Sequence, residues 1–283
     1  MMKEGRRLKS LDPFTTIVPY IMVERSDSQN TINESFDVSG AEALIRRLRQ
    51  DGYDSIGILH IIIAAYVRTI SQRPAVNRFI RGQKIYARNN IVINMAVKKK
   101  MSLEGQETTI KLVFEPSDTL YDVYDKVNAA LKEVYEGGDE GGVDAAARII
   151  GYIPGLVKKW AIWFLKTLDY FGFLPSFLTA LSPFHGSLFI TSMASLNIPP
   201  IKHHLYNFGN VPLFLAFGAK RPELLLDIDG NVKKRRVVDF VFNLDERICD
   251  GYYFASALKI FKKNLVFPDT LLEAPETIVE DVR

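Results

Sequence analysis

Apolar residues recur at helical spacing in three segments of the first half of the chain, and this pattern predicts three helices. The segments are 37–50, 55–74 and 119–131. The second is apolar almost all round, so we expect it to be buried in the middle of the fold and to end at Pro74. Ser39 and Glu42 have capping-box spacing in the first segment, and Thr119 with Asp122 is expected to cap the third.

Runs rich in β-branched and aromatic residues predict strands between and after these helices. The first run, 83–100, is predicted to form two strands. The other runs are 108–116, 188–193, 213–218, 223–228 and 232–244. The pair Asp229-Gly230 is a hairpin signal between the last two. A final helix is predicted from Tyr252 to about Leu265. This alternation of strands and helices indicates an α/β protein.

Composition narrows the classes of function. The 283 residues are enough for one large domain or two small ones. With 36 basic and 33 acidic residues the net charge is +3, too balanced to predict nucleic-acid binding. The lone Cys249 excludes an internal disulfide and a thiol pair for zinc. Since the N-terminus lacks the apolar core of a signal peptide, we expect a cytoplasmic protein.

The segment 150–184 is unusually aromatic and holds both tryptophans. Prolines and lysines interrupt any apolar run of the about 20 residues that a membrane span needs. Two short amphipathic helices are expected instead. We favour helices that pack on the core or line a substrate channel. The alternative is peripheral contact with a membrane surface, with Lys158, Lys159 and Lys166 reaching the lipid headgroups.

The glycine-rich stretch 136–142, EGGDEGG, separates this segment from the preceding helix. No Lys-Ser or Lys-Thr pair follows it and no strand precedes it, as a phosphate-binding loop would require. We therefore expect a flexible loop tip.

The stretch 244–256, LDERICDGYYFAS, reads as the end of a strand followed by a helix, with charged residues beside an Asp-Gly turn. It resembles the closing segment of the chloramphenicol acetyltransferase and dihydrolipoyl acyltransferase superfamily, which carries the motif H-x-x-x-D-G. Arg247, Asp250 and Gly251 match the dihydrolipoyl version, and the triplet that begins at Cys249 matches the chloramphenicol version. Three further stretches resemble the family in the same order, namely 34–45, 60–80 and 186–196.

This resemblance implies a two-layer α/β sandwich with a mixed sheet and packed helices. It implies a single acyltransferase-like domain over 1–283, with an aromatic-rich helical insertion at about 143–184. It also implies a homotrimer with active sites between subunits, in a channel that admits coenzyme A from one side and a small-molecule acceptor from the other. No lipoyl domain, peripheral subunit-binding domain or lipoyl group is expected, so the protein would act alone, with acyl-CoA as donor.

The resemblance also assigns roles to individual residues. Asp250 would hold the loop, paired with Arg247 or with an N-terminal arginine, and Gly251 would let the chain turn tightly. Ser192 matches the family's serine and would donate a hydrogen bond to the oxyanion. These roles are expectations carried over from the family.

Glu246 stands at the position of the family's catalytic histidine. Imidazole titrates near neutral pH, whereas a free glutamate has a pKa of about 4.3 and is a weaker base. Burial in an apolar channel would raise a carboxylate pKa, and an amine or thiol acceptor would need less help from a base. Three readings stay open: Glu246 is the base, another residue is the base, or the site transfers no acyl group.

His203 and His204 offer an alternative base because they follow the serine strand, although a histidine pair on a loop is more often polar surface. His60 is expected to be a hydrogen-bonded core residue, and Cys249 a small buried residue rather than a nucleophile. No repeated ligand spacing predicts a metal site.

Two functions from different classes follow. The first is a stand-alone enzyme that transfers an acyl group from acyl-CoA to a hydroxyl, amine or thiol; the aromatic segment favours a hydrophobic acceptor or a long acyl chain. The alternative is a catalytically inactive trimeric scaffold or acyl-ligand-binding protein that lost the motif histidine.

Overall fold

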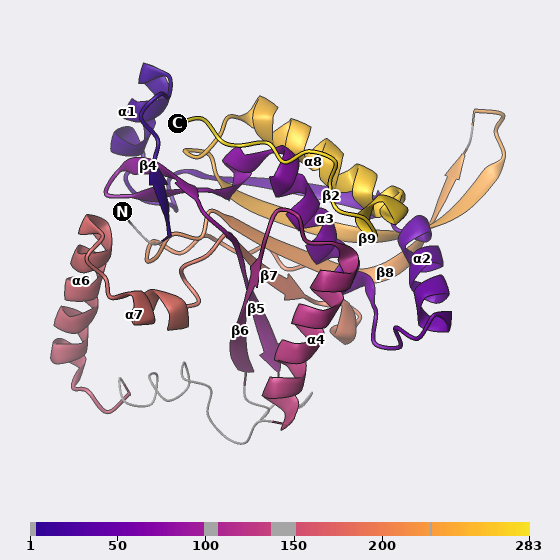
Figure 1. Cartoon of the computed structure of the whole chain (residues 1–283), viewed down its shortest axis with the longest axis horizontal. Helices are drawn as coiled ribbons and strands as arrows, with labels where there is room; N and C mark the ends of the chain where they lie inside the picture. Colours follow the sequence, from indigo (N-terminus) through magenta and orange to yellow (C-terminus); the bar gives the residue numbers. More distant parts are fainter. Residues whose placement is uncertain (1–3, 99–106, 137–150, 227) are drawn as a thin grey trace.

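The strands form two sheets in the computed structural model, which describes residues 4–98, 107–136, 151–226 and 228–283 (Figure 1). The larger sheet is mixed and has the order β2 (Gln29–Asp37), β9 (Val232–Asp245), β8 (Leu213–Leu226), β7 (Leu188–Ser192), β5 (Ile91–Lys98), β6 (Glu107–Phe114). Strand β7 is parallel to both of its neighbours, and the other pairs are antiparallel. The smaller sheet is antiparallel, in the order β1 (Gly5–Arg7), β4 (Lys84–Arg88), β3 (Arg78–Arg81).

Within the described ranges, four helices pack on one face of the larger sheet and enclose the hydrophobic core with it (Figure 1). They are α2 (Ser39–Gln50), α3 (Ile58–Gln72), α4 (Leu120–Glu136) and α8 (Gly251–Val266). Every second strand residue points into this layer, as with Leu213, Leu215 and Phe217 of β8. The two-layer α/β sandwich with a mixed sheet is therefore confirmed.

Helix α3 lies at the centre of the helical layer, as its all-round apolar pattern predicts. Ile61, Ile62 and Ile63 are fully buried, because neighbouring helices and the sheet surround the helix. The helix ends at Gln72, and Pro74 starts a short 3₁₀ turn, which confirms the predicted stop.

The two predicted helix caps have different outcomes. Thr119 and Asp122 cap α4, since the Thr119 N–H donates to the Asp122 carboxylate at 2.8 Å and the Asp122 N–H to the Thr119 hydroxyl at 3.4 Å. The capping role predicted for Ser39 is wrong. Ser39 is already helical, and its N–H donates to the carboxylate of Asp37 at 2.8 Å, because that side chain reaches the first free N–H of α2.

The C-terminal strands are longer than their sequence runs. The runs 213–218 and 223–228 join into the single strand β8, which has an irregular register between Phe217 and Lys220. Gly230 takes a positive φ of 81° in the predicted turn, and the outer ends of β8 and β9 project from the body (Figure 1). The sequence patterns did not predict β1, β3, the first part of β2 or the short helix α1 (Pro13–Ile21).

The aromatic segment forms α6 (Gly155–Phe171) and α7 (Ser176–Leu181), which lie outside the helical layer (Figure 1). The favoured expectation was that these helices pack on the core or line a substrate channel. Asp169 of α6 is buried, but the tryptophan residues of this helix are 66% and 57% exposed, so this aromatic face does not pack on the core of the chain. The lining of a channel stays a prediction. No helix within the described ranges is long and apolar enough to cross a membrane. The glycine-rich stretch from residue 137 and the start of the expected insertion, 143–150, lie outside the described residues.

Candidate functional site

The connection between β9 and α8 carries Glu246 and is held at both ends. The Glu246 N–H donates to the carbonyl of Ser28 at 2.9 Å. At the other end, the Asp250 carboxylate accepts from the N–H of Tyr253 at 2.7 Å and caps α8. Gly251 is the first residue of that helix. The backbone on either side of Glu246 therefore has a defined path.

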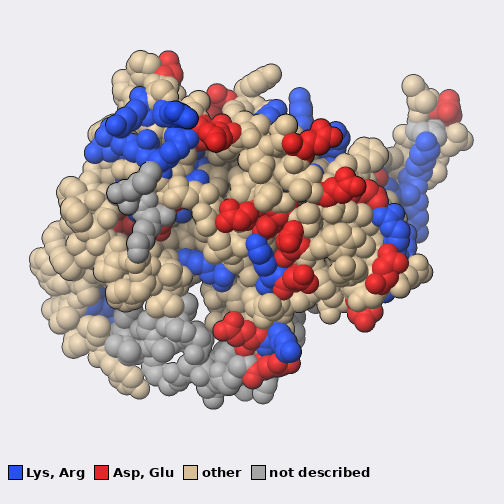
Figure 2. Space-filling view, in the orientation of Figure 1, with Lys and Arg blue, Asp and Glu red and all other residues tan. Residues whose placement is uncertain are grey.

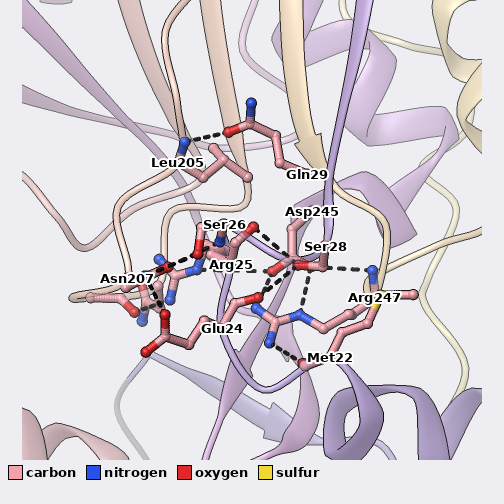
Figure 3. A network of polar contacts seen from close by, with 12 residues as sticks. Met22, Glu24, Arg25, Ser26, Ser28, Gln29, Leu205, Asn207, Asp245 and Arg247 are labelled. Carbon is pink, nitrogen blue, oxygen red and sulfur yellow. Dashed lines mark hydrogen bonds and ion pairs between the residues drawn. The ribbon is translucent and has the colours of Figure 1, made fainter.

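A buried ion pair straddles Glu246. The Arg247 Nε and Nη2 atoms donate to the two carboxylate oxygens of Asp245, each at 2.7 Å, and both residues are at most 3% exposed (Figure 3). Arg247 Nη1 also donates to the carbonyls of Met22 and Val23, at 2.9 and 3.0 Å. A short bidentate pair of this kind is among the strongest polar contacts in proteins and fixes the Arg247 side chain. The two bonds from Nη1 then join the Glu246 connection to the segment before β2.

The same segment, residues 22–29, contributes further polar contacts (Figure 3). The Ser28 hydroxyl donates to Asp245 at 3.0 Å, and Arg25 Nε lies 3.9 Å from that carboxylate. Burial lowers the pKa of Arg25 to about 10, although the charge of Asp245 opposes this shift. Asn207 donates to Glu24 at 2.7 Å and so ties the segment to the loop after β7.

These contacts correct the expected pairing of Arg247 with Asp250. Arg247 pairs with Asp245 and not with Asp250, because Asp245 is the buried last residue of β9 and the chain turns directly after it. Asp250 is exposed and serves as the helix cap. Asp245 and Arg25 were missed by the sequence reading. The available signal was the Asp-x-Arg spacing around Glu246, which places opposite charges two residues apart.

Glu246 lines a pocket of about 460 Å³ between α1 and the start of α8. Its carboxylate is partly buried and accepts a hydrogen bond from Asn30 Nδ2 at 2.6 Å. Apolar side chains of α1 form one wall of the pocket, among them Phe14, Val18 and Ile21. The pocket thus places a carboxylate beside an apolar surface, an arrangement that suits a ligand with a hydrophobic body.

Ser192 does not belong to this pocket. It pairs with Phe217 of β8, and Phe217 pairs with Phe240 of β9. Glu246 follows Phe240 by six residues. At about 3.3 Å per residue, Ser192 and Glu246 of one chain lie roughly 20 Å apart along the strand direction. One copy of the chain therefore does not bring the two predicted groups together.

The histidines are also apart from the Glu246 pocket. His203 stacks on Phe214, with ring centroids 4.3 Å apart, on the sheet face opposite the helical layer, and burial lowers its pKa. His204 is exposed. His60 is a buried core residue whose Nδ1 accepts from the Gly57 N–H at 3.1 Å, as predicted.

Cys249 is 7% exposed, which confirms the predicted small buried residue, and burial raises the pKa of its thiol to about 12. A thiol with this pKa is a poor nucleophile near neutral pH. In the part of the chain that the structure describes, no three His, Cys, Asp or Glu residues gather as metal ligands would.

Solved structures of acyltransferases share this fold. A probable dihydrolipoamide acetyltransferase from Listeria monocytogenes 4b F2365 has a TM-score of 0.58 at 14% identity, covering 91% of this chain and 94% of that chain. A chloramphenicol acetyltransferase has a TM-score of 0.53 at 12% identity, covering 94% of this chain and all of that one (100%). A catalytic core of the 2-oxoacid dehydrogenase multienzyme complex from Thermoplasma acidophilum has a TM-score of 0.54 at 12% identity, with 93% and 100% covered.

The protein therefore has the fold of the chloramphenicol acetyltransferase and dihydrolipoamide acetyltransferase catalytic domains, as its sequence motifs predict. The sequence matches no family model and no curated protein.

Proposed function

We propose that the protein is an acyltransferase whose active site forms between copies of the chain, with Glu246 of one copy as the base and Ser192 of a neighbouring copy as the oxyanion donor. The donor would be an acyl-CoA and the acceptor a hydroxyl, amine or thiol on a hydrophobic molecule. The observation that carries this proposal is the Glu246 carboxylate itself, anchored on both sides and lining an apolar pocket.

Motif spacing supports these residue roles. A structure of dihydrolipoamide acetyltransferase from Azotobacter vinelandii concerns a serine, a histidine and an asparagine in its catalytic mechanism. In that enzyme the histidine and asparagine are four residues apart, as are Glu246 and Asp250 here, and the serine precedes the histidine by 52 residues. Ser192 precedes Glu246 by 54 residues. The separation of roughly 20 Å within one chain is the reason for assigning the two groups to different copies.

The proposed step is a proton-coupled attack on the thioester. As the acceptor's O, N or S atom bonds to the carbonyl carbon, its proton passes to the Glu246 carboxylate. The carbonyl oxygen becomes an oxyanion, to which the Ser192 hydroxyl donates a hydrogen bond. Collapse of this intermediate breaks the C–S bond, and the leaving coenzyme A thiolate takes the proton back from Glu246. The acyl group moves and the base returns to its starting state.

The test is thiol release from a panel of acyl-CoAs with mixed acceptors. We expect Glu246→Gln and Ser192→Ala each to lower kcat/KM by roughly 10²-fold or more, because each removes a group that acts in the transition state. Glu276→Gln is the matched control, because Glu276 is exposed and away from the pocket. Its activity should equal that of the wild type.

Mixing the two inactive variants provides a sharper test. If each site takes Glu246 from one copy and Ser192 from another, co-refolded Glu246→Gln and Ser192→Ala chains will form some sites with both wild-type groups, and activity will return. Sites built within single chains would stay inactive after mixing. A monomeric protein, or acyl-CoA binding without turnover for any acceptor, would reject the proposal in favour of an acyl-ligand-binding protein.

A further inference from the structure

Helix α6 carries a continuous aromatic stripe that faces away from the body. The stripe residues recur at positions i, i+4, i+7, i+8 and i+15 of one helical face. They are Leu156, Trp160, Trp163, Phe164 and Phe171. Each of these side chains is more than half exposed. Such an apolar surface on a protein normally marks a contact with a partner or a membrane.

The direction of the stripe follows from one buried carboxylate. Asp169 comes thirteen residues after Leu156, about 220° around the helix at about 100° per residue, and so lies opposite the stripe. It points inward, 3.2 Å from His185 Nε2 and 3.5 Å from Arg81. Burial raises the pKa of Asp169, but its contacts with His185 and Arg81 outweigh this and hold the pKa below its usual value. A charged anchor therefore turns the aromatic face outward.

Basic residues accompany the stripe. Lys159 and Lys166 are exposed and, being seven residues apart, share one flank of α6. The C-terminal end of α6 rests on the β3–β4 turn, where the Tyr170 hydroxyl donates to Gln83 at 2.5 Å. Lys84 follows this turn and is exposed.

The basic surface continues across the smaller sheet. Arg7 pairs with Tyr86 of β4, and a hydrogen bond joins the next residue, Leu8, to Ile85. Continuing this register places Lys9 opposite Lys84. Figure 2 shows Lys and Arg side chains gathered over this region, at the upper left of the molecule.

The exposed charged residues of α6 itself are lysines. Asp169 is the only acidic residue in the sequence from 151 to 184, and it is turned inward. Self-association through this face would bring its lysines against one another, which opposes such a contact. An anionic lipid surface complements both features, because it offers phosphate groups to lysines and an interfacial region that suits tryptophan and tyrosine rings.

We propose that α6 binds the surface of an anionic lipid membrane, with its aromatic stripe at the level of the headgroups and with Lys159, Lys166 and Lys84 against lipid phosphates. The protein would lie on the membrane without crossing it. This contact goes beyond the proposed acyl transfer and does not depend on Glu246.

Intrinsic fluorescence tests the proposal directly, because both tryptophans of the chain, Trp160 and Trp163, lie on the stripe. We expect the full chain to bind vesicles of phosphatidylcholine mixed with phosphatidylglycerol, with a blue shift of tryptophan emission and quenching by brominated lipid. Binding to phosphatidylcholine alone should be clearly weaker, and added salt should weaken binding to the mixed vesicles.

Variants separate the apolar and charged contributions in co-sedimentation with the same vesicles. Trp160→Gln with Phe164→Gln should weaken binding roughly tenfold or more, because two aromatic side chains no longer leave water. Lys84→Gln with Lys159→Gln should remove the preference for phosphatidylglycerol. The matched control is Leu224→Gln with Leu226→Gln, on the projecting hairpin, where the side chains are similarly exposed. This control should bind like the wild type.

Three results would overturn the inference. They are the absence of a fluorescence change with mixed vesicles, equal binding by the aromatic double variant, and a change of oligomeric state in sedimentation when Trp160 and Phe164 are replaced. The last would show that copies of the chain cover the stripe. Thiol release with water-soluble substrates should be unchanged in the aromatic variant. A failure of the membrane-binding proposal is therefore distinguishable from a failure of the proposed acyl transfer.

Discussion

Replacement of Asp245 by asparagine removes the carboxylate that holds the Glu246 connection. Asp245 accepts two bonds of 2.7 Å from Arg247 and one of 3.0 Å from Ser28, and it lies 3.9 Å from Arg25. Asparagine has nearly the same shape, but it carries no charge, and its NH₂ group would face a guanidinium N–H. Two buried arginines would then lack this counter-charge, and one bidentate contact would become a single hydrogen bond.

The magnitude follows from the burial of the pair, whose side chains are both 2% exposed. Removing one partner of a buried ion pair destabilises a protein by about 3–5 kcal/mol. That is a large part of a total stability of about 5–15 kcal/mol. At about 2–4 °C per kcal/mol for a protein approaching this size, Tm should fall by about 6–20 °C.

Thermal and urea unfolding of the purified variants provide the assay. Asp269→Asn is the matched control, because Asp269 pairs with Arg47 on the surface, where their side chains are 63% and 53% exposed. An exposed pair contributes about 0–1 kcal/mol, so this control should change Tm little. If Asp245→Asn shifts Tm no more than the control does, the pair does not hold the site as argued.

A double variant isolates the pair itself. Asp245→Asn with Arg247→Met removes both charges, so it should be less destabilised than the sum of the two single variants. Strict additivity would show that the two side chains do not act as a unit, and this outcome would remove the main support for an anchored Glu246.

Two further predictions concern the same connection. Asp250→Ala should lower the free energy of unfolding by about 1 kcal/mol, because α8 loses its cap. Asp250→Asn should be nearly neutral, because asparagine also caps helices. Equal destabilisation by both variants would indicate that Asp250 acts through an ion pair instead. Burial raises the pKa of the Cys249 thiol from 9.0 to about 12. Between these pH values the folded protein keeps a thiol proton that the unfolded protein loses, so the free energy of unfolding falls as pH rises. Urea titrations across pH 9 to 11 should show a steeper fall for the wild type than for Cys249→Ala, and equal slopes would contradict the shift.

Much of the fold was predictable because its signals are local in the sequence. The all-round apolar pattern placed α3 in the core, Thr119 and Asp122 capped α4, and Gly230 marked the hairpin turn. The order of the family-like motifs then predicted the two-layer sandwich. The cap of α2 was misplaced because Asp37 and Ser39 both have side chains that can accept a bond from a helical N–H, and only the backbone path selects Asp37.

The candidate site was predictable only in part. Glu246 was found from the motif, but its anchor was assigned to Asp250, since sequence spacing does not show which carboxylate is buried. The pairing of Arg247 with Asp245 follows from the packing of residues 22–29 against the end of β9. The separation of Ser192 from Glu246 is likewise a property of the strand register.

The sequence by itself determined the periodicity of the elements, the turns, and the amphipathic character of α6, because each depends on residues close together in the chain. Only the tertiary structure decided that the aromatic stripe faces outward, since this depends on a contact between Asp169 and Arg81 of a distant strand. It also decided that Arg247 reaches Met22, more than two hundred residues earlier. Such contacts form between groups that folding alone brings together, so local pattern carries no record of them.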